Sequence, residues 1–212
     1  MAYIGPKTYA EYTCASADKS VQLPESLNFE QGACAMLQGL TGMMLTHETY
    51  RVQPGDVVLV HAAAGGTGQL LCQICKAMGA RVIGTTSTPE KAAVAKQAGA
   101  DDVILYTQED VVAKVKALTN GTGVNVVYDG VGKATFDLSL ASLRPRGWMI
   151  SFGNASGKPE PFDILRLAKG SFTLMRPTLF DFVATKADFQ RCMFIYWIEK
   201  ISRCCYSDEH LV

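Results

Sequence analysis

The sequence has no excess of charge of either sign, no long apolar run and no N-terminal targeting signal. Lysine and arginine number 20, and aspartate and glutamate also number 20, among 212 residues. This zero balance argues against a dedicated nucleic-acid binder, because such proteins neutralise phosphates with basic side chains. The longest apolar runs, 57–64 and 192–198, fall well short of the roughly 18 residues that a membrane helix needs. We expect neither nucleic acid nor membrane as a partner.

The cysteines do not form a disulfide pattern. Their number is odd, seven, and no basic stretch followed by an apolar one opens the chain, as a secretory signal would require. We therefore expect a reducing compartment, the cytoplasm. Cys72 and Cys75 form a single Cys-x-x-Cys pair on a predicted helix, which favours buried packing over a zinc or redox site. His47, His61 and His210 show no metal-ligand spacing, so we predict no metal site.

From residue 57 onward, short aliphatic runs alternate with amphipathic stretches. Strands are predicted at 57–60, 82–83, 103–105, 124–128, 148–152 and 172–175. Helices are predicted at 70–79, 89–99, 109–118 and 134–143. This alternation predicts βαβ units and an α/β fold with a doubly wound parallel sheet, the Rossmann architecture.

The segment before the first strand of this series is less regular. A short strand is predicted at 9–15. Apolar residues then recur at spacings of three and four and predict an amphipathic helix with one buried face: Phe29, Ala33, Met36, Leu37, Leu40 and Met44. Pro54 and Gly55 end this helix in a turn.

A glycine-rich turn follows the strand at 57–60 and opens a helix. Ala63, Gly65 and Gly68 occupy the three slots of the dinucleotide fingerprint. The first slot makes the tight turn, the second admits a diphosphate, and the third lets the helix pack on the strand. The helix N-terminus adds free N–H groups and a positive dipole end. Its position at the head of a βαβ series supports a dinucleotide site.

The residues at the end of the second strand indicate which dinucleotide binds. An NAD site usually carries a carboxylate there for the ribose hydroxyls, but residues 84–88 read Gly-Thr-Thr-Ser-Thr. Hydroxyl groups and the ammonium of Lys91 suit a 2′-phosphate, which a carboxylate would repel. The pattern favours NADPH over NADH.

Four segments carry a resemblance to a known family: Leu37–Thr41, His61–Gly68, Val126–Gly132 and Ser151–Gly157. The chain resembles the zinc-independent NADPH:quinone oxidoreductases, the zeta-crystallin-like branch of the medium-chain dehydrogenase/reductase superfamily. That family usually has valine at the position of Thr67. The resemblance covers roughly residues 2 to 190 and implies a Rossmann domain beside a GroES-like catalytic lobe.

The resemblance also implies roles for individual residues. It assigns Thr41 to the surroundings of the nicotinamide. It assigns the diphosphate to Ala64, Gly65, Gly66, Thr67 and Gly68. It assigns the 2′-phosphate and adenosine to Ser87, Lys91 and Tyr106. It assigns the nicotinamide half to Phe152, Gly153 and Asn154. No residue is assigned a catalytic acid or base role.

The domain limits follow from the same comparison. We expect residues 1–50 to be a remnant of the catalytic lobe with its linking helix, 51–190 to be the dinucleotide-binding domain, and 191–212 to be a divergent tail. The family match implies a zinc-independent reductase of quinones, or a truncated form of one, and a homodimer joined through the edge strand near 170–176. Two alternatives stay open: reduction of an enone or enoyl double bond, and a non-catalytic NADPH-binding interaction protein that lacks the substrate lobe.

Overall fold

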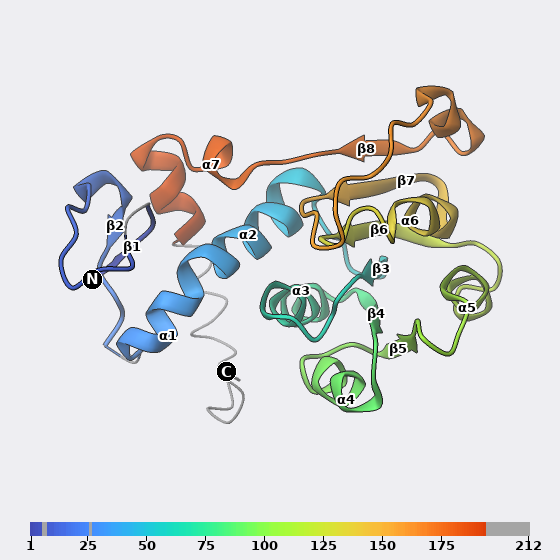
Figure 1. Cartoon of the computed structure of the whole chain (residues 1–212), viewed down its shortest axis with the longest axis horizontal. Helices are drawn as coiled ribbons and strands as arrows, with labels where there is room; N and C mark the ends of the chain where they lie inside the picture. The colour runs from blue at the N-terminus through green and yellow to red at the C-terminus, as the bar shows by residue number, and fades with distance from the viewer. Residues whose placement is uncertain (6–7, 26, 194–212) are drawn as a thin grey trace.

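A six-stranded parallel sheet in the order β5-β4-β3-β6-β7-β8 forms the centre of the molecule (Figure 1). The structure is a computed structural model, and it describes residues 1–5, 8–25 and 27–193. The strands are β3 Val57–Val60, β4 Arg81–Thr86, β5 Asp102–Leu105, β6 Val124–Asp129, β7 Leu143–Ser151 and β8 Thr173–Met175. All six predicted strands are present, and the predicted α/β Rossmann fold is confirmed.

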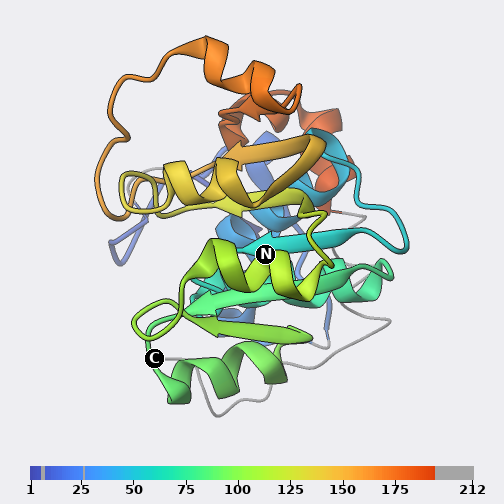
Figure 2. The ribbon, with the colours of Figure 1, turned by 90° about the vertical axis from the view of Figure 1, so that its right-hand side faces the viewer.

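Helices cover both faces of this sheet. They are α3 Gly66–Ala77, α4 Pro89–Gln97, α5 Val111–Leu118 and α6 Phe136–Ser142. On one face α3 and α4 enclose an apolar cluster, whereas α5 and α6 enclose a second cluster on the other face (Figures 1 and 2). The Thr88 hydroxyl accepts a bond from the third residue of α4, and the Asp110 carboxylate does the same for α5. These caps fix where both helices begin, beside the carboxyl ends of the strands.

The strand order reverses at β3: β4 and β5 are added on one side of it, and β6, β7 and β8 on the other. In open α/β sheets the crevice outside the carboxyl ends of the strands at such a switch point binds ligands. The segments that leave β3, β4 and β6 begin at His61, Ser87 and Gly130 respectively. The topology therefore brings these three loops to one edge of the sheet.

A long helical stretch precedes the sheet and lies against α3. It consists of α1 Phe29–Cys34, η2 Ala35–Gly39, α2 Leu40–Met43 and η3 Met44–Thr49, and η2 and η3 are π-helical. Met36, Leu40 and Met44 are buried as predicted. Phe29, Ala33 and Leu37 are exposed, so the predicted apolar face is wrong for half of its members. The wider π-helical turns shift the buried stripe off the 3.6-residue period on which the prediction was based.

The predicted strand at 9–15 is absent, and these residues are irregular and exposed. The short strands lie on either side of them, with β1 Ala2–Tyr3 pairing antiparallel to β2 Ser20–Val21. A strand forms only where a partner satisfies its backbone groups, and 9–15 has none among the described residues.

Four short helical elements complete the described chain. They are η1 Ala17–Lys19, η4 Ile164–Lys169, α7 Leu179–Phe182 and a helix over 186–193. None of the helices in the described ranges has the length and apolar character needed to cross a bilayer. Of the predicted divergent tail, residues 194–212 lie outside the described residues.

Candidate functional site

The turn between β3 and α3 is held in shape by backbone contacts. Ala62 adopts a positive φ of 51°, which makes the sharp change of direction after the strand. The Ala63 N–H donates to the Thr85 carbonyl at 3.1 Å and ties the turn to β4. A Cβ on Gly68 would lie 2.3 Å from the Ala62 carbonyl oxygen. Only glycine therefore lets the helix approach the strand this closely, as the third slot of the fingerprint predicts.

The first turn of α3 is open toward the edge of the sheet. Gly65 is the N-cap residue, and it has no side chain to accept a bond from the N–H groups of the turn. The N–H groups of Gly66, Thr67 and Gly68 therefore have no intrahelical acceptor, and the helix dipole makes this end positive. The predicted diphosphate residues thus form a contiguous turn with unused donors.

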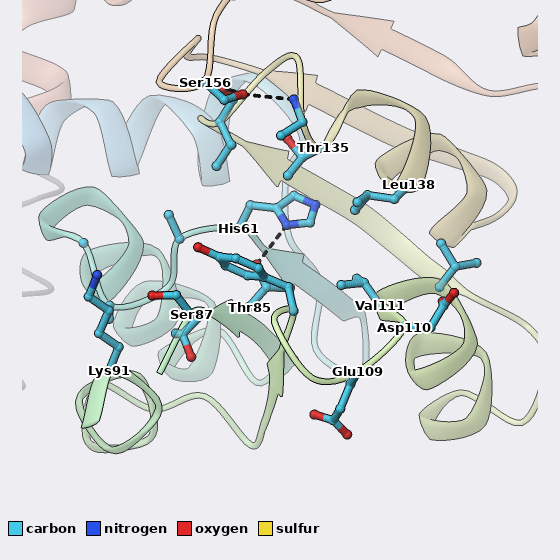
Figure 3. Close-up of a pocket in the computed structure, with 18 residues that line it drawn as sticks. His61, Thr85, Ser87, Lys91, Glu109, Asp110, Val111, Thr135, Leu138 and Ser156 are labelled. Carbon is cyan, nitrogen blue, oxygen red and sulfur yellow. Dashed lines mark hydrogen bonds between the residues drawn. The ribbon is translucent and has the colours of Figure 1, made fainter. Parts of the chain in front are cut away.

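A cavity of about 700 Å³ adjoins this turn (Figure 3). It is lined by His61, Ala62, Ala64, Gly65, Thr85, Thr86, Ser87, Lys91, Tyr106, Glu109, Asp110, Val111, Val112, Val131, Ala134, Thr135, Leu138 and Ser156. Lys91 and Ser87 reach it from one side and Asp110 and Leu138 from the opposite side, with His61 between them. Five of the twelve predicted site residues line it: Ala64, Gly65, Ser87, Lys91 and Tyr106.

The end of β4 carries hydroxyl groups and no carboxylate, as the sequence indicated. The cavity nevertheless includes two acidic residues that the sequence reasoning missed, Glu109 and Asp110. Glu109 accepts the Leu105 N–H at 3.1 Å and pairs with Lys114 at 2.8 Å, and the bond from Lys114 lowers its pKa. Asp110 caps α5 through the Ala113 N–H at 2.8 Å. Both carboxylates are thus already engaged by donors of the chain.

A buried polar network forms one wall of the cavity. The His61 ring lies 2.9 Å from the Thr85 hydroxyl through Nδ1 and 3.0 Å from the Ser139 hydroxyl through Nε2. Ser139 donates its proton to the Asp129 carboxylate at 2.9 Å, and Thr135 donates to the same group at 2.8 Å. Since Ser139 uses its proton on Asp129, it accepts from His61. The imidazole therefore carries its proton on Nε2 and accepts from Thr85 at Nδ1.

This network links three segments of the chain. His61 follows β3, Thr85 belongs to β4, and Asp129 ends β6. The other oxygen of Asp129 accepts the Val131 N–H at 2.8 Å and the Gly132 N–H at 3.0 Å, which fixes the loop after β6. Burial lowers the pKa of His61 to about 4, although the negative charge of Asp129 acts to raise it. The ring is therefore neutral at physiological pH.

The remaining predicted residues lie outside the cavity lining. Phe152, Gly153 and Asn154 follow β7 and pack against the loop after β6, where a Cβ on Gly153 would lie 2.4 Å from the Gly130 carbonyl oxygen. The Thr41 hydroxyl, in the helix before the sheet, donates to the Leu37 carbonyl at 2.7 Å. These four residues are thus separate from the group that meets at the cavity.

The sequence also matches a known protein family. A family described as zinc-binding dehydrogenase matches residues 66–194, more than half of the chain. The chain belongs to this family.

Several known proteins are similar to this chain over most of its length. A quinone oxidoreductase of Pseudomonas aeruginosa is 45% identical over 183 residues, which are 86% of this chain and 56% of that protein. A 2-haloacrylate reductase of a Burkholderia species is 38% identical over 193 residues, 88% of this chain and 58% of that protein. The Escherichia coli quinone oxidoreductase, solved in complex with NADPH, superposes with a TM-score of 0.84 at 41% identity. The superposition covers 88% of this chain and 58% of that structure. The chain thus spans little more than half the length of these relatives.

The family name raises the question of zinc. Within the ranges that the structure describes, no group of three or more His, Cys, Asp and Glu side chains is arranged to hold a metal ion. The side chains of residues 1–5, 8–25 and 27–193 thus do not fit a zinc centre. Cys72 and Cys75 are buried in α3, and burial raises the pKa of the Cys72 thiol to about 12, which fits the packing role predicted for them.

Proposed function

We propose that the chain binds NADPH across the carboxyl edge of the sheet. The observation that carries the proposal is the uncapped first turn of α3 beside a cavity that hydroxyl groups at the end of β4 and Lys91 of α4 line. N–H donors at a helix N-terminus suit a diphosphate, and a lysine with neighbouring hydroxyls suits the 2′-phosphate. A relative that has been solved with NADPH adds support.

The proposed contacts are those that the sequence predicted. Ala64, Gly65, Gly66, Thr67 and Gly68 hold the diphosphate, and Ser87, Lys91 and Tyr106 hold the phosphorylated adenosine. Thr41, Phe152, Gly153 and Asn154 hold the nicotinamide half. The neutral imidazole of His61 keeps the walls of the cavity together without adding a charge.

The proposed activity is the reduction of quinones. When bound, NADPH supplies a hydride to the substrate. In this proposal the chain orients the nicotinamide against the substrate. The names of the bacterial relatives support this substrate class. We assign no proton donor to the chain.

A second candidate activity is the reduction of an activated carbon–carbon double bond. The Burkholderia relative is named a reductase of 2-haloacrylate, an alkene conjugated to a carboxylate, and it is 38% identical to this chain. Both reactions use the same cofactor site and differ in the electrophile that receives the hydride.

The test is oxidation of NADPH by the purified chain with a benzoquinone or with 2-chloroacrylate. Faster turnover of the quinone supports the first activity, and faster turnover of the alkene supports the second. NADPH binding without turnover of either substrate would contradict both and favour a non-catalytic NADPH-binding protein.

The assembly is part of the same proposal. We propose a homodimer in which the β8 strands of two copies meet. β8 is the outermost strand of the sheet, so one of its sides is unpaired within the described chain, and an exposed sheet edge is a template for strand addition. Sedimentation at twice the chain mass of 22.9 kDa would support this assembly, and sedimentation at the single mass would contradict it.

The proposal also covers the division of the chain and its location. We propose that residues 51–190 are the dinucleotide-binding part, 1–50 an N-terminal part that includes the linking helix, and 191–212 a tail, because all six strands of the parallel sheet lie between residues 57 and 175. We further propose a cytoplasmic location. Cys72 is a buried free thiol, which suits a reducing compartment.

A further inference from the structure

Gln38 lies directly against the first residue of α3, although 28 positions separate it from Gly66 in the chain. A Cβ on Gly66 would lie 2.5 Å from Gln38 Nε2, 2.6 Å from Oε1 and 2.7 Å from Cδ. The carboxamide therefore occupies the space that any side chain at position 66 would fill. Gly66 is the first residue of α3, so the amide stands at the open end of that helix.

The packing of the helical stretch 29–49 against α3 sets the position of Gln38. A Cβ on Gly42 would lie 2.9 Å from Ile74 Cδ1, so the helix rests closely on α3 one turn after Gln38. Leu40 and Met43 of the same helical stretch are buried. Gln38 itself is half-buried, and no hydrogen bond holds its carboxamide to another residue in the part of the chain that the structure describes. The fold thus places the Gln38 amide at the first residue of α3, with its polar atoms available for hydrogen bonds.

The chemistry of an amide suits this place. Its Nε2 carries two N–H donors, and the neighbouring first turn of α3 presents N–H donors of its own. An anion bound at that turn would receive bonds from both elements. Thr41 lies three residues after Gln38 in the same helical stretch. A contact at Gln38 would therefore connect the diphosphate end of the site to the helix that carries Thr41.

We propose that Gln38 is a diphosphate-binding residue, which donates from Nε2 to a diphosphate oxygen of the cofactor. This inference rests on the proposed NADPH site and adds to it a ligand from outside the glycine-rich turn. One contact of the diphosphate then comes from the helix at 29–49, and the others come from the glycine-rich turn and the first residues of α3.

The test is a set of three substitutions at position 38 that differ in charge. The NADPH affinity of each variant is measured by fluorescence titration. Gln38→Glu places a carboxylate beside the phosphates, so the affinity should fall by roughly tenfold or more. Gln38→Leu removes the donors without adding charge, and the affinity should fall by a few-fold, roughly three to five. Gln38→Lys supplies a cationic donor and should match or exceed the wild-type affinity.

A second ligand separates a contact from a change in fold. Adenosine 2′-monophosphate carries the 2′-phosphate and no diphosphate, so its affinity should stay within roughly twofold of wild type in all three variants. Gln97→Glu is the matched control, because Gln97 is exposed at the end of α4 and does not line the cavity. It makes the same change of charge and should leave both affinities unaltered.

Two results would overturn the inference. One is a Gln38→Glu variant that keeps wild-type NADPH affinity. The other is an equal loss of NADPH and adenosine 2′-monophosphate, which would mean that residue 38 only supports the fold. If Gln38→Glu does not fold, the uncharged Gln38→Leu variant decides between these outcomes. A wild-type chain that binds neither ligand would instead refute the NADPH site itself.

Discussion

At the scale of single residues, the buried His61 ring joins the loops that form the cavity. It is 3% exposed, and both of its nitrogens are bonded to hydroxyl groups of other elements. Burial favours the neutral ring because a buried charge loses its hydration. The folded chain therefore resists protonation at a pH where the unfolded chain takes up a proton.

This difference predicts a loss of stability in acid. The pKa of His61 is about 4 in the folded chain and 6.5 in the unfolded chain. The stabilisation that the neutral ring contributes to the folded chain is complete above pH 6.5. It is lost as the pH falls toward 4, and the total loss is about 3 kcal/mol. Between pH 7.5 and 5 the free energy of unfolding should fall by about 2 kcal/mol more in the wild type than in His61→Asn, measured by urea titration. Equal pH dependence in both proteins would contradict this role of the ring.

Two glycines of the turn should separate folding from binding. A Cβ on Gly68 meets backbone atoms at 2.3 and 2.9 Å, so Gly68→Ala should destabilise the fold by roughly 2–4 kcal/mol. A Cβ on Gly65 meets only the Ala62 carbonyl oxygen, at 3.3 Å, and Gly65 has a negative φ that alanine tolerates. Gly65→Ala should stay within about 1 kcal/mol of wild type yet bind NADPH roughly tenfold more weakly. Thermal unfolding and NADPH titration of both variants check these two predictions. A Gly65→Ala variant that keeps the full NADPH affinity would refute the prediction on binding.

Sequence reasoning was weakest at this scale. The turn residues were predicted because their spacing in the chain is local and fixed. The network around His61 was missed, since its members are 24 and 78 residues away in the sequence. Gln38 was missed for the same reason. The available signal was modest: a histidine and an aspartate directly at the carboxyl ends of two buried strands, where parallel strands meet at one edge.

At the scale of elements, we propose that the junction of β4 and α4 determines cofactor choice. Thr88 caps α4, and Lys91 follows in its first turn, facing the cavity. Lys96 lies on the same helix but does not line the cavity. The two lysines thus form a natural pair for comparison, since each carries one positive charge on an exposed side chain.

Replacement of the first lysine should reduce selectivity for the 2′-phosphate. Lys91→Ala should weaken NADPH binding by roughly tenfold and leave NADH binding within twofold, because one charge-assisted bond to the phosphate is lost. Lys96→Ala should change neither affinity. Titration of each variant with both cofactors gives the answer, and equal losses for NADPH and NADH would show that Lys91 does not contact the 2′-phosphate.

The elements themselves were largely predictable, with two exceptions that have physical causes. The strands of the sheet are buried on both faces and read as short aliphatic runs, so their pattern survives in the sequence. The π-helical turns in 29–49 rotated the buried face, so Leu37 is 55% exposed where a regular helix would bury it. Residues 9–15 have a strand-like sequence, but a strand also requires a partner, which the sequence of the segment does not reveal.

At the scale of the molecule, two apolar clusters stabilise the sheet, and the cluster on the α3 face continues into the N-terminal helix. Met36, Leu40 and Met43 belong to the same cluster as Val58 and Leu71. The helix at 29–49 is therefore part of one cooperative core with the dinucleotide-binding sheet. A ligand that bridges them, as proposed for Gln38, should stabilise the whole unit upon binding.

The most direct test of the central claim is thermal unfolding of the purified chain with NADPH and with NADH at equal concentrations. A ligand at about 100 times its Kd stabilises the native state by about 2.7 kcal/mol. For a chain of this size NADPH should then raise the Tm by roughly 5–10 °C, and NADH should raise it clearly less. No shift with NADPH, or equal shifts with both cofactors, would contradict an NADPH site at the carboxyl edge of this sheet.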